Sequence, residues 1–102
     1  MPNVVKKHSI SSELAQKMVD KAVAKAREIG VSENVAILDD SGNLKAFSRM
    51  DGASIPTIEI AQNKVDGEIV GAIGVSGAPT VQNDVDCARA ALAVVTDAVA
   101  AG

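Results

Sequence analysis

With 102 residues, the chain is long enough for one domain with a modest hydrophobic core. Hydrophobic residues make up 47% and charged residues 23%, a composition that is globular and excludes a disordered chain. A net charge of −3 and a single aromatic residue argue against a nucleic-acid partner. One cysteine leaves no internal disulfide, and no apolar run is long enough to span a membrane, so we expect a cytoplasmic protein without a membrane partner.

The first half of the chain predicts a helix followed by a β-hairpin. A serine pair at 11–12 can cap the helix at its start, and Gly30 is suited to end it. Between these points apolar residues recur at helical spacing: Leu14, Met18, Ala22, Ala26 and Ile29. Residues 34–38 and 43–50 then read as two strands, because four turn-forming residues at 39–42 separate them.

The second half predicts a helix, a strand and a long C-terminal helix. Residues 55–64 have helical spacing, residues 68–76 form a β-branched run, and Thr80 can cap a helix that reaches about Val99. The order of elements therefore indicates an α+β domain with helices on an antiparallel sheet. One contradiction remains in this interpretation: the Asp-Gly pair at 66–67 favours a hairpin turn, which needs a strand on both sides.

Consecutive motifs resemble one known family over nearly the whole of residues 1–102, which we interpret as a single domain. The motifs occupy residues 24–31, 35–44, 47–53, 58–64, 65–77 and 86–92. In this order they resemble the GlcG/HbpS-like family, which also occurs as the C-terminal domain of PduO. The resemblance implies a profilin-like sandwich that assembles into homo-oligomers. It also implies an association with haem or with corrinoid metabolism, since some members bind haem, although many have no established activity.

The chain departs from the family pattern between Lys64 and Val65. Relatives that it resembles carry a longer segment there, and that segment supplies the strand that enters the hairpin. Either the protein carries a deletion there, or the numbering closes over missing residues. If the deletion is real, the strand at 68–76 lacks its hairpin partner and must pair elsewhere. An unpaired strand edge invites pairing with another chain, so we expect oligomerisation to hold the shortened protein together.

Six residues are candidates for a ligand-binding site. They are Arg49, Asp51, Glu59, Lys64, Ser76 and Gly77. The first four place charges of both signs near one loop, where they could bind a carboxylate or serve in acid–base chemistry. A surface ion-pair network explains these four as well. The last two lie between a strand and a helix, where free backbone N–H groups can hold an anion, although an ordinary tight connection has the same sequence.

The remaining chemically active residues have simpler explanations. His8 could ligate haem iron, but it lies on a predicted N-terminal arm at 1–10, where a solvated side chain is the simpler interpretation. Met50 and Cys87 fit buried core positions. Without a cluster of cysteine and histidine residues, we expect no metal site.

Three functions therefore remain open. The leading hypothesis is a small oligomeric ligand-binding protein, with haem, another tetrapyrrole or a corrinoid implied by the resemblance alone. The second is an enzyme that acts on a small carboxylate or hydroxy acid, in which Arg49 binds the acid and Glu59 or Asp51 is the general base. The third is a structural assembly module without a ligand.

Overall fold

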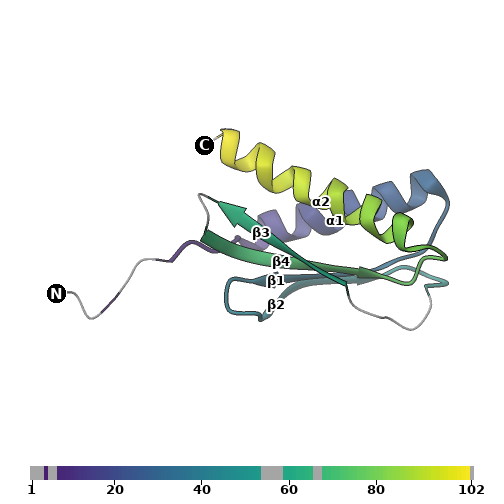
Figure 1. Ribbon diagram of the computed structural model, residues 1–102, viewed down its shortest axis with the longest axis horizontal. Coiled ribbons are helices and arrows are strands. Elements are labelled where there is room, and N and C mark those ends of the chain that lie inside the picture. The colour runs from purple at the N-terminus through teal and green to yellow at the C-terminus, as the bar shows by residue number, and fades with distance from the viewer. Residues whose placement is uncertain (1–3, 5–6, 54–58, 66–67, 102) are drawn as a thin grey trace.

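Over its described residues, the protein has two helices that lie on the same face of a four-stranded antiparallel sheet (Figure 1). The computed structural model describes residue 4 and residues 7–53, 59–65 and 68–101. The elements are α1 (Ser12–Ile29), β1 (Asn34–Asp39), β2 (Leu44–Arg49), β3 (Glu59–Val65), β4 (Glu68–Ser76) and α2 (Val81–Ala101). In the sheet the strands follow the order β2–β1–β4–β3. The predicted α+β class, with helices on an antiparallel sheet, is therefore confirmed.

Both helices begin where the sequence places their caps. The Ser11 hydroxyl accepts a hydrogen bond from the Leu14 N–H at 3.1 Å, and the Thr80 hydroxyl accepts one from the Asn83 N–H at 3.2 Å. Gly30 ends α1 with a φ of 77°, a left-handed conformation that glycine adopts without strain. Neither helix is long and apolar enough, over its described residues, to cross a membrane.

The core lies between the sheet and the two helices. Val35 and Ile37 of β1 and Ile73 and Val75 of β4 are buried against the helices, where Met18 is the largest fully buried side chain. The helices contribute small buried residues at their contacts with the sheet and with each other: Ala15, Ala22, Ala26 and Ala91. Because these side chains have little volume, backbones can approach closely and fill a core that has no aromatic residue among its buried members.

The first hairpin forms as predicted. β1 and β2 pair antiparallel, with Asn34 opposite Arg49, and one irregularity falls between Ile37 and Leu38. The Asp39 carboxylate accepts hydrogen bonds from the backbone N–H groups of residues 41 and 43, each at 2.9 Å. These bonds satisfy turn donors locally, which explains why a cluster of aspartate, serine and glycine residues separates the strands.

The predicted helix at residues 55–64 is wrong where the structure describes it, because residues 59–65 form the strand β3. Its proposed start at residues 54–58 lies outside the described residues. β3 pairs antiparallel with β4, and β4 also pairs with β1 on its other side. The expectation that residues 68–76 lack a partner is therefore also wrong. The hydrogen bonds that residues 59–65 form with the open edge of β4 stabilise a strand more than the helical spacing of this short segment stabilises a helix. The Asp-Gly pair in the sequence had indicated a strand on both sides.

The end of the N-terminal arm is part of the core. The Ile10 side chain is 4% exposed, and its N–H donates a hydrogen bond to the Val70 carbonyl at 3.2 Å. Gly71 permits this contact, since a Cβ atom there would lie 2.6 Å from the Leu38 carbonyl oxygen and 3.0 Å from Ile10. Only glycine fits at such a separation, so β4 needs it between two neighbouring segments.

Candidate functional site

The structure brings five of the six candidate residues, all except Lys64, to one end of the sheet. Asn34 pairs with Arg49 on β2 and with Ser76 on β4, so these three residues form a row across the sheet. Asn34 and Ser76 are almost fully buried, whereas Arg49 is exposed. Gly77 follows directly, with a φ of 107°, in the connection to α2.

Two other candidates, Glu59 and Lys64, lie on one strand and not on a shared helix. Glu59 pairs with Val75, which places it at the same end as Ser76. Lys64 pairs with Ile69 near the opposite end of β3. At about 3.3 Å per strand residue, five positions separate the two backbones by roughly 17 Å. The predicted cluster of four charged residues is therefore divided between two ends of the sheet.

The sixth candidate, Asp51, lies in the turn that follows β2. Its carbonyl oxygen accepts a hydrogen bond from the Ser32 hydroxyl at 2.8 Å. Asp51 lines a pocket of about 310 Å³ with Arg49 and with Arg27 from the end of α1. The structure therefore supports the predicted proximity of Arg49 and Asp51 and adds an arginine from a distant part of the sequence.

A fully buried acid, Glu33, lies behind this end of the sheet. It is 0% exposed, and its backbone carbonyl accepts a hydrogen bond from the Met50 N–H at 3.0 Å. Its carboxyl group faces the Asp84 carboxyl group and the Cys87 thiol of α2. Neither carboxyl oxygen forms a hydrogen bond of good geometry with these or other described residues. A buried charge without a partner is costly, so this group is expected to be neutral.

The electrostatics of Glu33 agree with a neutral acid. Burial, followed by the neighbouring Asp84 carboxyl group, raises the pKa of Glu33 from 4.5 to about 8. Burial, with the charges of Glu33 and Asp84, also raises the pKa of the Cys87 thiol to about 12. Cys87 is therefore protonated near neutral pH and unsuited to nucleophilic catalysis. One feature of the sequence indicated that Glu33 is buried: it continues the alternation of residues 35 and 37, which form the buried face of β1.

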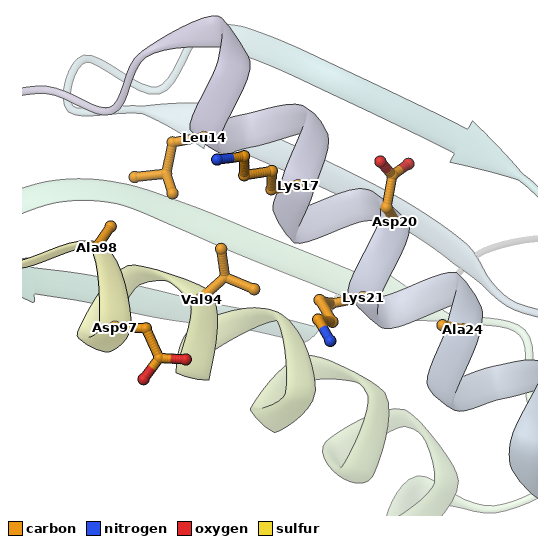
Figure 2. A pocket seen from close by; sticks show the side chains of 8 residues that line it. All are labelled: Leu14, Lys17, Asp20, Lys21, Ala24, Val94, Asp97 and Ala98. Atoms are coloured by element: carbon orange, nitrogen blue, oxygen red, sulfur yellow. The ribbon is translucent and has the colours of Figure 1, made fainter. Parts of the chain in front are cut away.

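A large cavity lies between the two helices (Figure 2). It has a volume of about 560 Å³ and is lined by Leu14, Lys17, Asp20, Lys21, Ala24, Val94, Asp97 and Ala98. We call it the α1–α2 cavity. Figure 2 shows Lys21 extending from α1 toward α2, whereas the Lys17 side chain lies beside Leu14. Neither lysine forms an ion pair with another described residue. Their charges are therefore available to a ligand.

A second pocket adjoins the α1–α2 cavity on the side of the N-terminal arm. It has a volume of about 300 Å³, and Leu14 and Ala98 line both spaces. Its walls include His8, together with the apolar side chains of Val70 and Val95. The imidazole that sequence reasoning placed on a solvated arm therefore lies beside an apolar pocket.

Sequence reasoning missed the α1–α2 cavity because its apolar residues belong to stripes that also predict core packing. The available signal was the spacing of Lys17 and Lys21, which puts two positive charges one turn apart beside such a stripe. No group of three or more histidine, cysteine, aspartate or glutamate residues able to hold a metal ion occurs within the described ranges. The α1–α2 cavity thus offers apolar walls, two amines and two carboxylates, and the adjoining pocket offers one imidazole.

A family model described as haem degrading protein HbpS-like matches residues 10–66 and 64–93. The two matched segments meet at residues 64–66, where the sequence comparison places the shortened segment. Among curated proteins, none matches the chain.

Several solved structures share the fold. Protein ORFY from Klebsiella pneumoniae is 21% identical, with a TM-score of 0.84 over 94% of this chain and 97% of that chain. HbpS is 24% identical, with a TM-score of 0.83 over 91% of this chain and 94% of its own. The PduOC–haem complex is 19% identical, with a TM-score of 0.76 over 84% and 94% of the two chains. These similarities show the layered fold that the resemblance implied.

Proposed function

Because this chain belongs to the HbpS-like family, we propose that it is a haem-associated ligand-binding protein whose ligand occupies the α1–α2 cavity. The family description names haem, and a protein of the same fold, PduOC, has been solved as a haem complex. The cavity volume of about 560 Å³, with an adjoining pocket lined by His8, is the observation that carries the proposal. Cavities of this size accommodate cofactor-sized ligands.

The residues of the cavity fit the chemistry of haem. Leu14 and Val94 present apolar surface, which favours a flat tetrapyrrole and excludes water from it. Lys17 and Lys21 would bind the two propionate groups through charge-assisted hydrogen bonds. His8 would ligate the iron through a ring nitrogen. When bound, haem supplies redox and axial-ligand chemistry, and the chain contributes binding and orientation.

Titration with hemin tests the proposal. We expect a shifted Soret band that saturates at one equivalent, and we expect binding to weaken about tenfold or more in the double variant Lys17→Ala/Lys21→Ala. Lys45→Ala is the matched control, because Lys45 is an exposed lysine on β2 outside the cavity lining. Absence of a Soret shift in the wild-type protein would refute haem binding. Equal weakening in the control would refute the assignment to this cavity.

Two further arms identify the ligand and the role of His8. His8→Ala should change the shape of the Soret band while the tetrapyrrole still binds, because the variant removes an iron ligand and leaves the apolar walls intact. Cobalamin tested under the same conditions addresses the corrinoid alternative. If neither tetrapyrrole raises the melting temperature, the chain is better described as a structural assembly module.

We also infer that the protein self-associates through the face of the sheet that the described helices leave uncovered (Figure 1). β4 already has two partners, so the reason is not an unpaired strand. Leu44 and Phe47 of β2 are 62% and 55% exposed, which is unusual for large apolar side chains. Sedimentation velocity should show a homo-oligomer, and Leu44→Ser should shift the distribution toward the monomer.

A further inference from the structure

We propose that the first two turns of α2 open away from the sheet as pH rises, and that the proton on Glu33 controls this opening. The proposal does not depend on haem binding. It concerns residues 81–87, which we call the start of α2. It rests on the weak attachment of these residues to the core, and on a fully buried acid that faces them without a described positive charge beside it.

The start of α2 has little apolar contact with the core. Residues 81–86 are all exposed or half-buried, and Val81 is 61% exposed. Cys87 is the first fully buried side chain of α2, and the next buried residues, Ala91 and Val95, lie one and two turns further along. Lifting residues 81–87 would therefore expose little apolar surface, while Ala91 and Val95 hold the rest of the helix on the core.

Two carboxyl groups lie next to each other at the start of α2. Glu33 is fully buried, and neither of its carboxyl oxygens forms a hydrogen bond of good geometry with a described residue. The neighbouring carboxyl group, that of Asp84, accepts a hydrogen bond from the Ala78 N–H at 3.3 Å and so holds the connection between β4 and α2. A negative charge on Glu33 would repel the carboxylate on which this connection depends.

No described positive charge balances these two acids. From α2 the titratable groups near Glu33 are Asp84 and Cys87, with Asp86 acting on the thiol. Beyond the end of β2, Met50 presents its sulfur atom, which accepts a hydrogen bond from the Glu33 N–H at 3.4 Å. No charged group among the described residues of α1 or β4 affects the Glu33 carboxyl group. Glu33 must therefore be neutral while the start of α2 is in place.

Opening of the start of α2 changes the acidity of Glu33. In the closed form, burial and then Asp84 raise the pKa of Glu33 from 4.5 to about 8. In the open form water reaches the carboxyl group, and its pKa returns toward 4.5. Between these two values, opening releases one proton, so the open fraction should rise about tenfold per pH unit. Low pH favours the closed form, and this advantage is lost as pH rises toward 8.

Hydrogen exchange measured by mass spectrometry on the full chain tests the proposal. Amides of residues 84–87 should exchange faster than those of β1, because the start of α2 opens while the central strands stay paired. After correction for intrinsic exchange rates, the opening constant of these amides should rise about 100-fold from pH 5.5 to pH 7.5. It should not change with pH in Glu33→Gln, which has no proton to release. Glu28→Gln is the matched control, because Glu28 is an exposed acid and its loss should leave the wild-type rise unchanged.

The Cys87 thiol provides a second measurement over the same pH range. Ellman's reagent needs both an open helix start and a thiolate, so labelling should accelerate about 100-fold per pH unit in the wild type and about tenfold in Glu33→Gln. Circular dichroism verifies that each variant is folded. Asp84→Asn is a second variant, since it removes the neighbouring charge and keeps an oxygen for the Ala78 N–H. It should make the total rise in opening smaller.

Two results would overturn the proposal. The first is exchange of amides 84–87 no faster than that of β1, which would mean that only global unfolding exposes the start of α2. The second is the same pH dependence of opening in the wild type as in Glu33→Gln, or in Asp84→Asn should the glutamine variant not fold.

Discussion

Replacing Glu33 with glutamine should make the stability of this protein less dependent on pH. The wild-type carboxyl group is fully buried beside Asp84 and Cys87, and its pKa is raised to about 8. Glutamine has nearly the same shape and cannot ionise. The difference in unfolding free energy between the two proteins therefore isolates the ionisation of one buried group.

The magnitude follows from the two pKa values of Glu33. In the unfolded chain the carboxyl group titrates near 4.5, whereas in the folded protein it keeps its proton up to about pH 8. Between these values the folded state binds more protons than the unfolded state, so the unfolding free energy falls as pH rises. At 1.36 kcal/mol per pH unit, the loss from pH 5 to pH 8 amounts to about 4 kcal/mol.

Urea unfolding, followed by far-ultraviolet circular dichroism between pH 5 and pH 8.5, measures this loss. At pH 5 both side chains are neutral when buried, so Glu33→Gln should lie within about 1 kcal/mol of the wild type. At pH 8 the variant should be the more stable protein, by about 4 kcal/mol. The matched control is Glu28→Gln, because Glu28 is exposed and forms only a surface ion pair with Lys25 at 3.6 Å.

The stability curves of the wild type and Glu33→Gln would run parallel if the reasoning were wrong. Parallel curves over pH 5 to 8.5 would mean that Glu33 is ionised in the folded protein at a near-ordinary pKa. A wild type that gained stability relative to the variant as pH rose would show the opposite sign, which is expected only for a carboxylate stabilised by a partner.

Three further predictions follow from local contacts. Ser11→Ala removes the acceptor for the Leu14 N–H, and chemical denaturation should show a loss of about 1 kcal/mol, whereas Ser11→Asp should retain most of the stability. Gly71→Ala places a Cβ atom 2.6 Å from the Leu38 carbonyl oxygen, so the melting temperature should fall by several degrees; an unchanged value would refute the tight contact. Cys87 is buried and its pKa is raised to about 12, so the native thiol should react with Ellman's reagent at pH 8 only as fast as the protein opens, and rapid labelling would contradict this.

Local signals were sufficient for five of the six elements. Ser11 marks the start of α1 and Gly30 its end, because the capping hydrogen bonds form with backbone atoms close by in sequence. Asp39 specifies the first turn for the same reason. The segment at 59–65 was misassigned because its apolar spacing suits a helix, while its conformation depends on pairing with β4. Of the two local signals, the Asp-Gly pair was the correct one, since hairpin turns restrict backbone conformation more strictly than spacing does.

The sites were less predictable than the fold. Arg49 and Asp51 could be grouped because they are close in sequence, but Arg27 joins them only through the packing of α1 against β2. Lys17 and Lys21 face a cavity whose other wall is formed by α2, at the far end of the chain. A pocket built from segments that are distant in sequence leaves no local pattern in the sequence. Composition and spacing therefore indicated which residue types could bind a ligand, but not which residues come together in one pocket.

The pairing of β1 with β4 at the centre of the sheet also determines how fast the protein can fold. The pairs β1–β2 and β3–β4 each join strands that are neighbours in sequence. The pair β1–β4 joins different halves of the chain, and its paired residues run from Asn34 with Ser76 to Asp39 with Gly71. Forming the β1–β4 pair costs much more chain entropy than forming either pair of sequence neighbours, because it closes a longer loop. Folding should therefore resemble that of mixed α/β domains and be slower than that of a helical bundle of equal length. Side chains along β1 and β4 should then control the rate of folding, while those on the outer strand β2 should mainly control the rate of unfolding.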